Sequence, residues 1–225
     1  YFQNSVAAFM TDRRIAAFDI RPKGYMWVIA EISMKVSEDA PIWRERITSE
    51  VKVSELTSSR AYFDFCLRRN SGEIYASGTG IWTPIDHATG RPVHISDLCE
   101  VRGTDNVVQS KHPKMKFESS DDLISENEHI TTMNDMDFNK HVGNRSYVNY
   151  AVRDFPADFA GTHYVSSLAI KFIRQTFVGD TLISRCFRIE GNGLDYLVRM
   201  GFPSGDEACI LRLGWEKRML PTPAI

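Results

Sequence analysis

Two halves of this chain carry the same features in the same order, at a nearly constant separation along the sequence. The corresponding positions are Ile32 and Leu168, Ile47 and Ile183, and Trp82 and Trp215. The offset is 136 residues for the first two pairs and 133 for the tryptophans, so the second copy is three residues shorter in one loop. A repeat of this kind indicates one supersecondary unit present twice.

Both copies read as short antiparallel strands, because apolar, β-branched and aromatic residues alternate or cluster between Gly, Asn and Ser turns. The strand segments of the first copy are 32–36, 47–51, 61–65 and 81–82, with a turn at 70–72. Those of the second copy are 168–172, 183–186, 194–198 and 214–215, with a turn at 203–205. Each copy therefore predicts about four antiparallel strands.

A helix is predicted before the strands of each copy. In the second copy it runs from Asn144, a candidate N-cap, to Phe155, where Pro156 follows. In the first copy it covers about Phe2 to Thr11. The second copy also has a preceding strand, about 128–133, whose counterpart is missing from the first. We therefore expect the gene product to continue upstream of Tyr1 by ~20 residues or more, the length of a strand plus a loop.

The predicted fold class is α+β, a double hot dog: two tandem hot-dog repeats, each a long helix wrapped by an antiparallel sheet. The boundaries are an N-terminal repeat over 1–102, lacking its first strand, a polar linker over 103–125, and a C-terminal repeat over 126–225. Such a chain resembles a fused homodimer, and both a monomer and a homodimer are compatible with it.

Composition excludes several classes of function. The net charge of −2 gives no general attraction to nucleic acid or to an anionic membrane. No apolar run reaches the ~18 residues of a membrane span. The four cysteines are widely spaced, without a Cys-x-x-Cys pair, so a zinc ribbon is disfavoured and free thiols of a reducing, cytoplasmic compartment are expected. The sequence predicts no metal and no cofactor.

The most informative segment, 134–144, lies between a predicted strand and a predicted helix. Asp137, Asn139 and His141 occupy alternate positions, and alternate residues of an extended segment share one face. They would converge beside a helix N-terminus, whose free N–H groups can stabilise an oxyanion. The alternative is that these residues serve a turn or a cap, as Asp and Asn often do, and spacing alone leaves both open.

The pattern Asp-x-Asn-x-His-Val-x-Asn-x-x-Tyr resembles the signature of the acyl-ACP thioesterases of plants and bacteria. Further segments that resemble this family are Trp27–Met34, Ala40–Trp43 and Trp82–Pro92, within a match from about Trp27 to Trp215. The resemblance implies a thioester hydrolase that releases free fatty acid from acyl-acyl carrier protein in a bacterial cytoplasm. The alternatives are an acyl-CoA thioesterase and a non-hydrolytic acyl-binding hot-dog protein.

The resemblance also implies roles for individual residues. His141 would be the general base that, with Asp137, activates a water, and Asn139 would position the thioester or the water. The family's catalytic glutamate falls here on Gln175, which cannot act as a base but can hold a water. Thr176 stands where some members have a cysteine. Direct water attack is therefore expected, with an acyl-enzyme through Asp137 as the alternative. Asp135 is expected to be a loop or cap residue.

The family binds the acyl chain mainly in the first hot dog, which implies an apolar tunnel there. Candidate lining residues lie on the first helix and the first long strand: Phe9, Met10, Met26, Trp27 and Met34. At each position the alternative is ordinary core packing. The implied partner is an acyl carrier protein that carries a fatty acyl chain, or acyl-CoA.

Overall fold

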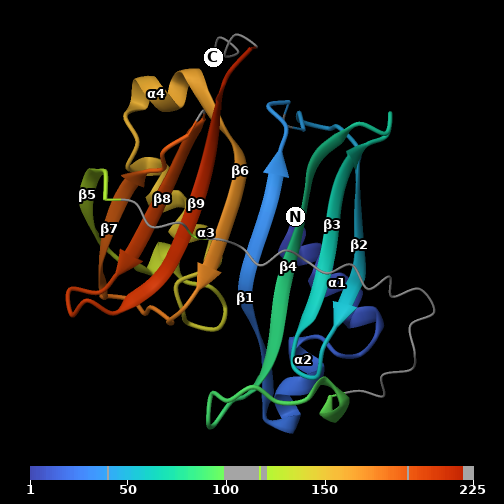
Figure 1. Ribbon diagram of the computed structural model, residues 1–225. Helices are drawn as coiled ribbons and strands as arrows, with labels where there is room; N and C mark the ends of the chain where they lie inside the picture. The colour runs from blue at the N-terminus through green and yellow to red at the C-terminus, as the bar shows by residue number, and fades with distance from the viewer. Residues whose placement is uncertain (40, 99–116, 118–120, 192, 220–225) are drawn as a thin grey trace. The chain divides into compact units, whose positions relative to one another are not determined.

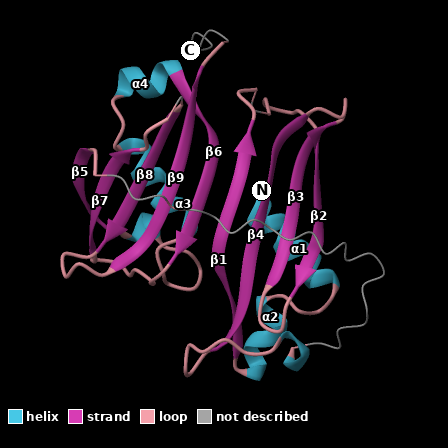
Figure 2. Ribbon diagram, viewed as in Figure 1, coloured by secondary structure: helices cyan, strands magenta, loops and turns pink. Residues whose placement is uncertain are grey.

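The computed structural model describes residues 1–39, 41–98, 117, 121–191 and 193–219. The chain divides into two units, Tyr1–Lys114 and Met115–Ile225. Each unit is an antiparallel sheet with helices packed on it, as Figures 1 and 2 show. The expected α+β class and the expected pairing of a helix with an antiparallel sheet in each repeat are confirmed.

The first unit has four strands in the order β2-β3-β4-β1, each antiparallel to its neighbour. Its strands are β1 (Tyr25–Val36), β2 (Ile47–Leu56), β3 (Ala61–Arg69) and β4 (Ile74–Asp86). Its helices are α1 (Phe2–Asp12) and α2 (Ala17–Ile20), with 3-10 turns η1 (Arg21–Lys23) and η2 (Ile95–Asp97). Helix α1 turns its buried residues, Phe2, Val6 and Met10, towards the sheet.

The second unit has five strands in the order β6-β9-β8-β7-β5. Its strands are β5 (Leu123–Ile130), β6 (His163–Phe172), β7 (Thr181–Arg188), β8 (Leu194–Gly201) and β9 (Glu207–Lys217). Its helices are α3 (Asn144–Arg153) and α4 (Ala157–Thr162), with a 3-10 turn η3 (Met133–Asp135). Helix α3 packs on the sheet and contacts β7 and β9 (Figure 1).

The internal repeat extends to a shared irregularity. In the first unit the register of β1 against β4 shifts between Ile29 and Glu31, where Ile29 faces Trp82. In the second unit the register of β6 against β9 shifts between Val165 and Ser167, where Val165 faces Trp215. Both bulges therefore fall at equivalent positions beside the tryptophan, which confirms the alignment of the two halves. A bulge bends a strand and increases its twist.

Each unit has a buried tryptophan in its core. Trp82 is 5% exposed and packs edge-on against Phe2 of α1 and Phe63 of β3, at centroid distances of 5.4 and 5.2 Å. A Cβ at Gly80 would lie 2.2 Å from the Trp82 ring, so only glycine leaves room for it. In the second unit Trp215 packs against Phe155, with a centroid distance of 4.8 Å. Each repeat thus holds its helical segment to its last strand through aromatic contacts.

Several expected boundaries are wrong. The strand expected at 128–133 is β5, Leu123–Ile130, so 123–125 are strand rather than linker, and 103–116 and 118–120 lie outside the described residues. Strand β5 is an edge strand in which His129 alone is buried, and this weakens its apolar pattern. Helix α3 ends at Arg153, and its N-cap is Gly143 rather than Asn144.

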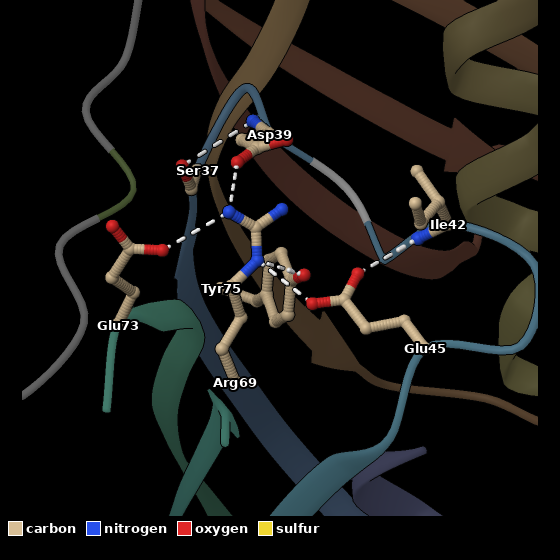
Figure 3. Close-up of polar contacts among 7 residues, drawn as sticks. All are labelled: Ser37, Asp39, Ile42, Glu45, Arg69, Glu73 and Tyr75. Carbon is tan, nitrogen blue, oxygen red and sulfur yellow. Dashed lines mark hydrogen bonds and ion pairs between the residues drawn. The ribbon is translucent and has the colours of Figure 1, made fainter. Parts of the chain in front are cut away.

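Around Arg69 a set of ionic contacts secures the loop between β1 and β2 (Figure 3). Its guanidinium pairs with Asp39 at 2.7 Å, Glu45 at 2.8 Å and Glu73 at 3.0 Å, and its Nε also bonds the Tyr75 hydroxyl. The pKa of Glu45 is held below its usual value, chiefly by its own hydrogen bond with the Tyr75 hydroxyl. The N–H of Ile42 and the Arg69 guanidinium lower it further. One cation therefore ties this loop to the β3–β4 turn.

A buried histidine ties β5 to the end of α3. His129 Nε2 lies 3.1 Å from Asp154 Oδ2, and the two side chains are 4% and 6% exposed. Its Nδ1 lies 2.7 Å from Arg153 Nη2. Because a guanidinium only donates, Nδ1 accepts, and the ring proton sits on Nε2 facing Asp154. The ring also stacks on Tyr150 at 4.6 Å. These contacts fix the strand that leads into the motif segment.

Candidate active site

The motif segment folds into a tight loop between η3 and α3. Met136 and Val142 form an isolated antiparallel bridge that closes the loop. Inside it the N–H of Asp137 donates to the carbonyl of His141 at 2.9 Å, and the N–H of Lys140 donates to the carbonyl of Asp137 at 3.1 Å. Lys140 takes a φ of +64°, a conformation in which a side chain costs energy. The loop presents Asp137, Asn139 and His141 within five residues.

Asp137 holds this loop through its side chain. Its Oδ1 accepts the backbone N–H of Asn139 at 2.8 Å and that of His141 at 3.4 Å. The carboxylate thus bonds the main chain of His141 and not its ring among the described contacts. The turn-forming role that the sequence left open is real. It is also compatible with a chemical role, because the side chain remains exposed.

His141 is half-buried, and its ring meets an aromatic side chain from another segment. The Phe177 ring lies edge-on to it, with centroids 5.1 Å apart and planes at 77°. Phe177 is itself 49% exposed. An edge-on contact restricts the rotation of the imidazole.

Gln175 lies in the segment that adjoins the motif loop. The carbonyl of the next residue, Thr176, accepts the N–H of Val142 at 2.8 Å. Gln175 therefore directly precedes Thr176, which bonds Val142, and Val142 directly follows His141. Its side chain is exposed and makes no hydrogen bond to any residue that the structure describes. The structure thus brings all four proposed catalytic residues into two hydrogen-bonded segments of the second unit.

The N-terminus of α3 begins directly after this loop. No side chain caps it, and its first turn carries no acidic residue. The first N–H groups of a helix lack intrahelical partners and attract negative charge. Because the helix is ten residues long, its dipole is developed enough to favour an oxyanion near the motif loop.

Asp135 is a cap residue, as expected. Its carboxylate accepts the N–H and the hydroxyl of Thr132, each at 2.8 Å, at the start of η3. Burial acts to raise the pKa of Asp135, but these hydrogen bonds outweigh it and hold the pKa below its usual value. The carbonyl of Asp135 also accepts the N–H of Gly143 at 2.7 Å, so this residue bonds the end of the motif loop to its start.

The five candidate acyl-chain residues all lie in the first unit. Met10 belongs to the buried face of α1, while Phe9 packs edge-on against Phe63 and lies under the Arg13 guanidinium. Trp27 donates its indole N–H to the carbonyl of Ile15 at 2.8 Å. The remaining two, Met26 and Met34, are half-buried on β1. These contacts are those of a core, and a tunnel through it remains a prediction.

Burial disfavours thiol chemistry at two cysteines, Cys186 and Cys209. Cys66, Cys186 and Cys209 are free thiols, and Cys99 lies outside the described residues. Burial raises the pKa of Cys186 to about 12 and raises that of Cys209 further. Both thiols therefore stay protonated and poorly nucleophilic. Among the described residues, no group of three His, Cys, Asp or Glu side chains is placed to hold a metal ion.

Two contacts of the site were not foreseen from the sequence. Tyr147 donates its hydroxyl to Thr176 Oγ1 at 2.9 Å, and both side chains are buried. The motif itself offered a signal for the first partner, since its final tyrosine is Tyr147. For Phe177 there was no signal, because an exposed aromatic residue in a loop has no periodic pattern to mark it.

Two antiparallel sheets related by an internal repeat, each with a helix packed on it, define a double hot-dog protein, as the sequence predicted. Residues 118–217 match the acyl-ACP thioesterase C-terminal domain family. The predicted resemblance to acyl-ACP thioesterases is thereby confirmed, and the match covers the motif loop, α3 and all strands from β6 to β9.

Individual relatives and solved structures agree. Dodecanoyl-[acyl-carrier-protein] hydrolase of Cinnamomum camphora is 27% identical over 177 residues, 74% of this chain and 45% of that protein. The enzyme of the same name from Umbellularia californica is 25% identical over 217 residues, 89% of this chain and 55% of that protein. The chain thus spans about half the length of these relatives.

Similarity of fold extends over nearly the whole chain. The structure of an acyl-ACP thioesterase from Bacteroides thetaiotaomicron superposes with a TM-score of 0.79 at 17% identity, covering 96% of this chain and 86% of that one. The 12:0-ACP thioesterase from Umbellularia californica superposes with a TM-score of 0.74 at 24% identity, covering 89% and 76%. At these identities the structures establish the fold.

The two roles of Asp137 can be separated by substitution. Asp137→Asn keeps an Oδ1 acceptor for both N–H groups but removes the charge, whereas Asp137→Ala removes both. We expect the alanine variant to lose about 1 kcal/mol of unfolding free energy and the asparagine variant to lose less, measured by urea denaturation. Thioester hydrolysis should fall about a hundredfold in both. A wild-type rate in Asp137→Asn would show that the carboxylate only shapes the loop.

Proposed function

We propose that this protein hydrolyses acyl-acyl carrier protein to free fatty acid and carrier thiol. The observation that carries the proposal is the hydrogen bond between two segments. The motif loop carries Asp137, Asn139 and His141, and the adjoining segment carries Gln175. The uncapped start of α3 directly follows the motif loop. These supply a base, amide donors and an oxyanion environment, the groups that thioester hydrolysis needs.

In the proposed reaction a water oxygen attacks the thioester carbonyl carbon while the His141 imidazole takes a proton from that water. The carbonyl oxygen becomes an oxyanion that the N-terminus of α3 and the Asn139 amide stabilise. The C–S bond then breaks, and His141 returns the proton to the leaving thiolate. The Gln175 amide orients the water. Asp137 keeps the loop in shape and its negative charge favours the imidazolium that forms.

An acyl-enzyme through Asp137 is less well supported. Its Oδ1 is engaged with two backbone N–H groups, and these bonds withdraw electron density from the carboxylate that would attack. Such an intermediate would also leave the loop without its brace while the acyl group was attached. Direct attack by water needs no change in this arrangement.

The acyl chain would be held by the first unit, through Phe9, Met10, Met26, Trp27 and Met34. Their apolar surroundings suit a hydrocarbon chain, and methionine adapts to chains of different shape. We also propose a bacterial, cytoplasmic protein that acts as a monomer or homodimer. As a separate finding, the described part of the chain contains no candidate membrane-spanning helix.

A panel of matched C8 to C18 substrates on acyl carrier protein and on CoA tests the proposal. We expect turnover of acyl-ACP with a kcat/KM at least tenfold above that of acyl-CoA, because the relatives named above act on the carrier protein. Release of free fatty acid is measured by mass spectrometry. A preference for CoA would favour an acyl-CoA thioesterase. Acyl-chain binding without turnover on either carrier would favour a non-hydrolytic binding protein.

Gln175 offers a second test, because the resemblance to the family implies a glutamate at this position. A carboxylate there can accept a proton from water, which an amide cannot do. We therefore expect Gln175→Glu to raise kcat about tenfold or more in steady-state assays, and Gln175→Ala to lower it. An unchanged rate in Gln175→Glu would show that the amide already does all that the chemistry requires.

A further inference from the structure

Thr176 lies at the junction of three parts of the second unit. It is fully buried, although its neighbours Gln175 and Phe177 are exposed. Its side chain accepts the Tyr147 hydroxyl from α3 at 2.9 Å, and its carbonyl accepts the N–H of Val142 from the motif loop at 2.8 Å. One residue thus joins the helix, the motif loop and the segment that carries Gln175.

The inward direction of this residue sets the outward direction of its neighbours. With Thr176 turned into the core, Gln175 and Phe177 face outward. The motif loop shows the same alternation, since Val142 is 5% exposed while His141 next to it is half-buried and meets the Phe177 ring. Val142 and Thr176 are thus buried where the two segments join, and His141 and Gln175 directly precede them in the chain.

Other contacts secure the following turn, 177–180, by different means. Thr131 Oγ1 donates to the carbonyl of Asp180 at 3.0 Å, and the N–H of Gly179 donates to the carbonyl of Thr131 at 3.0 Å. The N–H of Phe177 is bonded by the Asp180 carboxylate at 2.8 Å. The chain beyond Phe177 is thus held in place independently of Tyr147. On the Gln175 side, the side-chain bond to Tyr147 is the contact that fixes Thr176 against α3.

The hydroxyl of Thr176 does not serve as a nucleophile. It is fully buried and engaged by Tyr147, which packs edge-on against Phe172. Burial, opposed by this bond, raises the pKa of Tyr147 to about 12. Tyr147 therefore stays protonated and remains a donor across the working range of pH.

We propose that Tyr147 and Thr176 form a positioning pair, whose buried hydroxyl–hydroxyl bond sets Gln175 against His141 and so governs kcat rather than substrate affinity. The effect on kcat rests on the proposed hydrolysis. The effect on the position of the His141 ring rests on geometry alone and can be followed by nuclear magnetic resonance. Both residues are buried and act through their neighbours.

Four variants test the pair. Tyr147→Phe removes the donor, Thr176→Val removes the acceptor while keeping the shape of the side chain, and Thr176→Ser keeps the hydroxyl. The double variant Tyr147→Phe with Thr176→Val replaces both polar partners by apolar groups, which restores stability relative to the single changes. Tyr196→Phe removes the hydroxyl of another buried tyrosine in the same unit, on β8, and serves as the matched control.

We expect Tyr147→Phe and Thr176→Val to lower kcat about 10- to 100-fold with KM changed less than about twofold, since small misplacements cost this much. Thr176→Ser and Tyr196→Phe should stay within about threefold of wild type. In the double variant the melting temperature should recover towards wild type while kcat stays low. If kcat instead recovers together with the melting temperature, or if the single variants keep the wild-type kcat, the pair is only structural and the proposal fails.

Nuclear magnetic resonance of the His141 ring provides a readout that is independent of turnover. Its signals, assigned by their loss in His141→Gln, should shift in Tyr147→Phe and Thr176→Val but not in Thr176→Ser or Tyr196→Phe. Unshifted signals in the first two variants would overturn the pair. Absence of turnover in the wild type would overturn the proposed hydrolysis instead, and the ring signals would still decide the positioning role.

Discussion

A single main-chain hydrogen bond, from the N–H of Val142 to the carbonyl of Thr176, joins the two segments on which the proposed chemistry depends. One segment carries the proposed base, His141, with Asp137 and Asn139, and the other carries Gln175, so the proposed site needs both. The bond holds the two segments together because both of its residues are buried and therefore well fixed. The Asp137 carboxylate on one side and the Tyr147 hydroxyl on the other keep the two segments in shape up to this junction.

Burial also separates the ionisable groups of the second unit into those that keep their protons and those that lie near solvent. The thiols of Cys186 and Cys209 and the phenol of Tyr147 have raised pKa values because they are buried, so they keep their protons. Asp137 and His141 lie at or near the surface of the motif loop. The groups able to exchange protons with a substrate are therefore on the loop and not in the core, which favours attack by water over a thiol mechanism.

The sequence predicted the repeated unit well, because burial against a sheet imposes periodic patterns that survive even weak identity between the halves. The equivalent bulges beside Trp82 and Trp215 could not be foreseen, since a bulge changes register without changing composition. Strand β5 was misplaced because an edge strand with one buried residue has little periodicity. The motif predicted the segment that carries Asp137, Asn139 and His141, and their catalytic roles stay a prediction. It could not predict that Asp137 would bond main-chain N–H groups, or that Phe177 would meet His141, because both depend on the folded loop.

Every proposed catalytic role in the second unit requires that the motif loop performs thioester hydrolysis. Single-turnover release of free fatty acid from acyl-ACP, compared between wild type and His141→Ala at equal concentrations of folded protein, decides whether it does. We predict fatty acid release by the wild type and a loss of at least about a hundredfold without the imidazole. Equal release by both proteins would contradict the proposed mechanism, because the base would then lie outside the loop that Val142 and Thr176 hold in place.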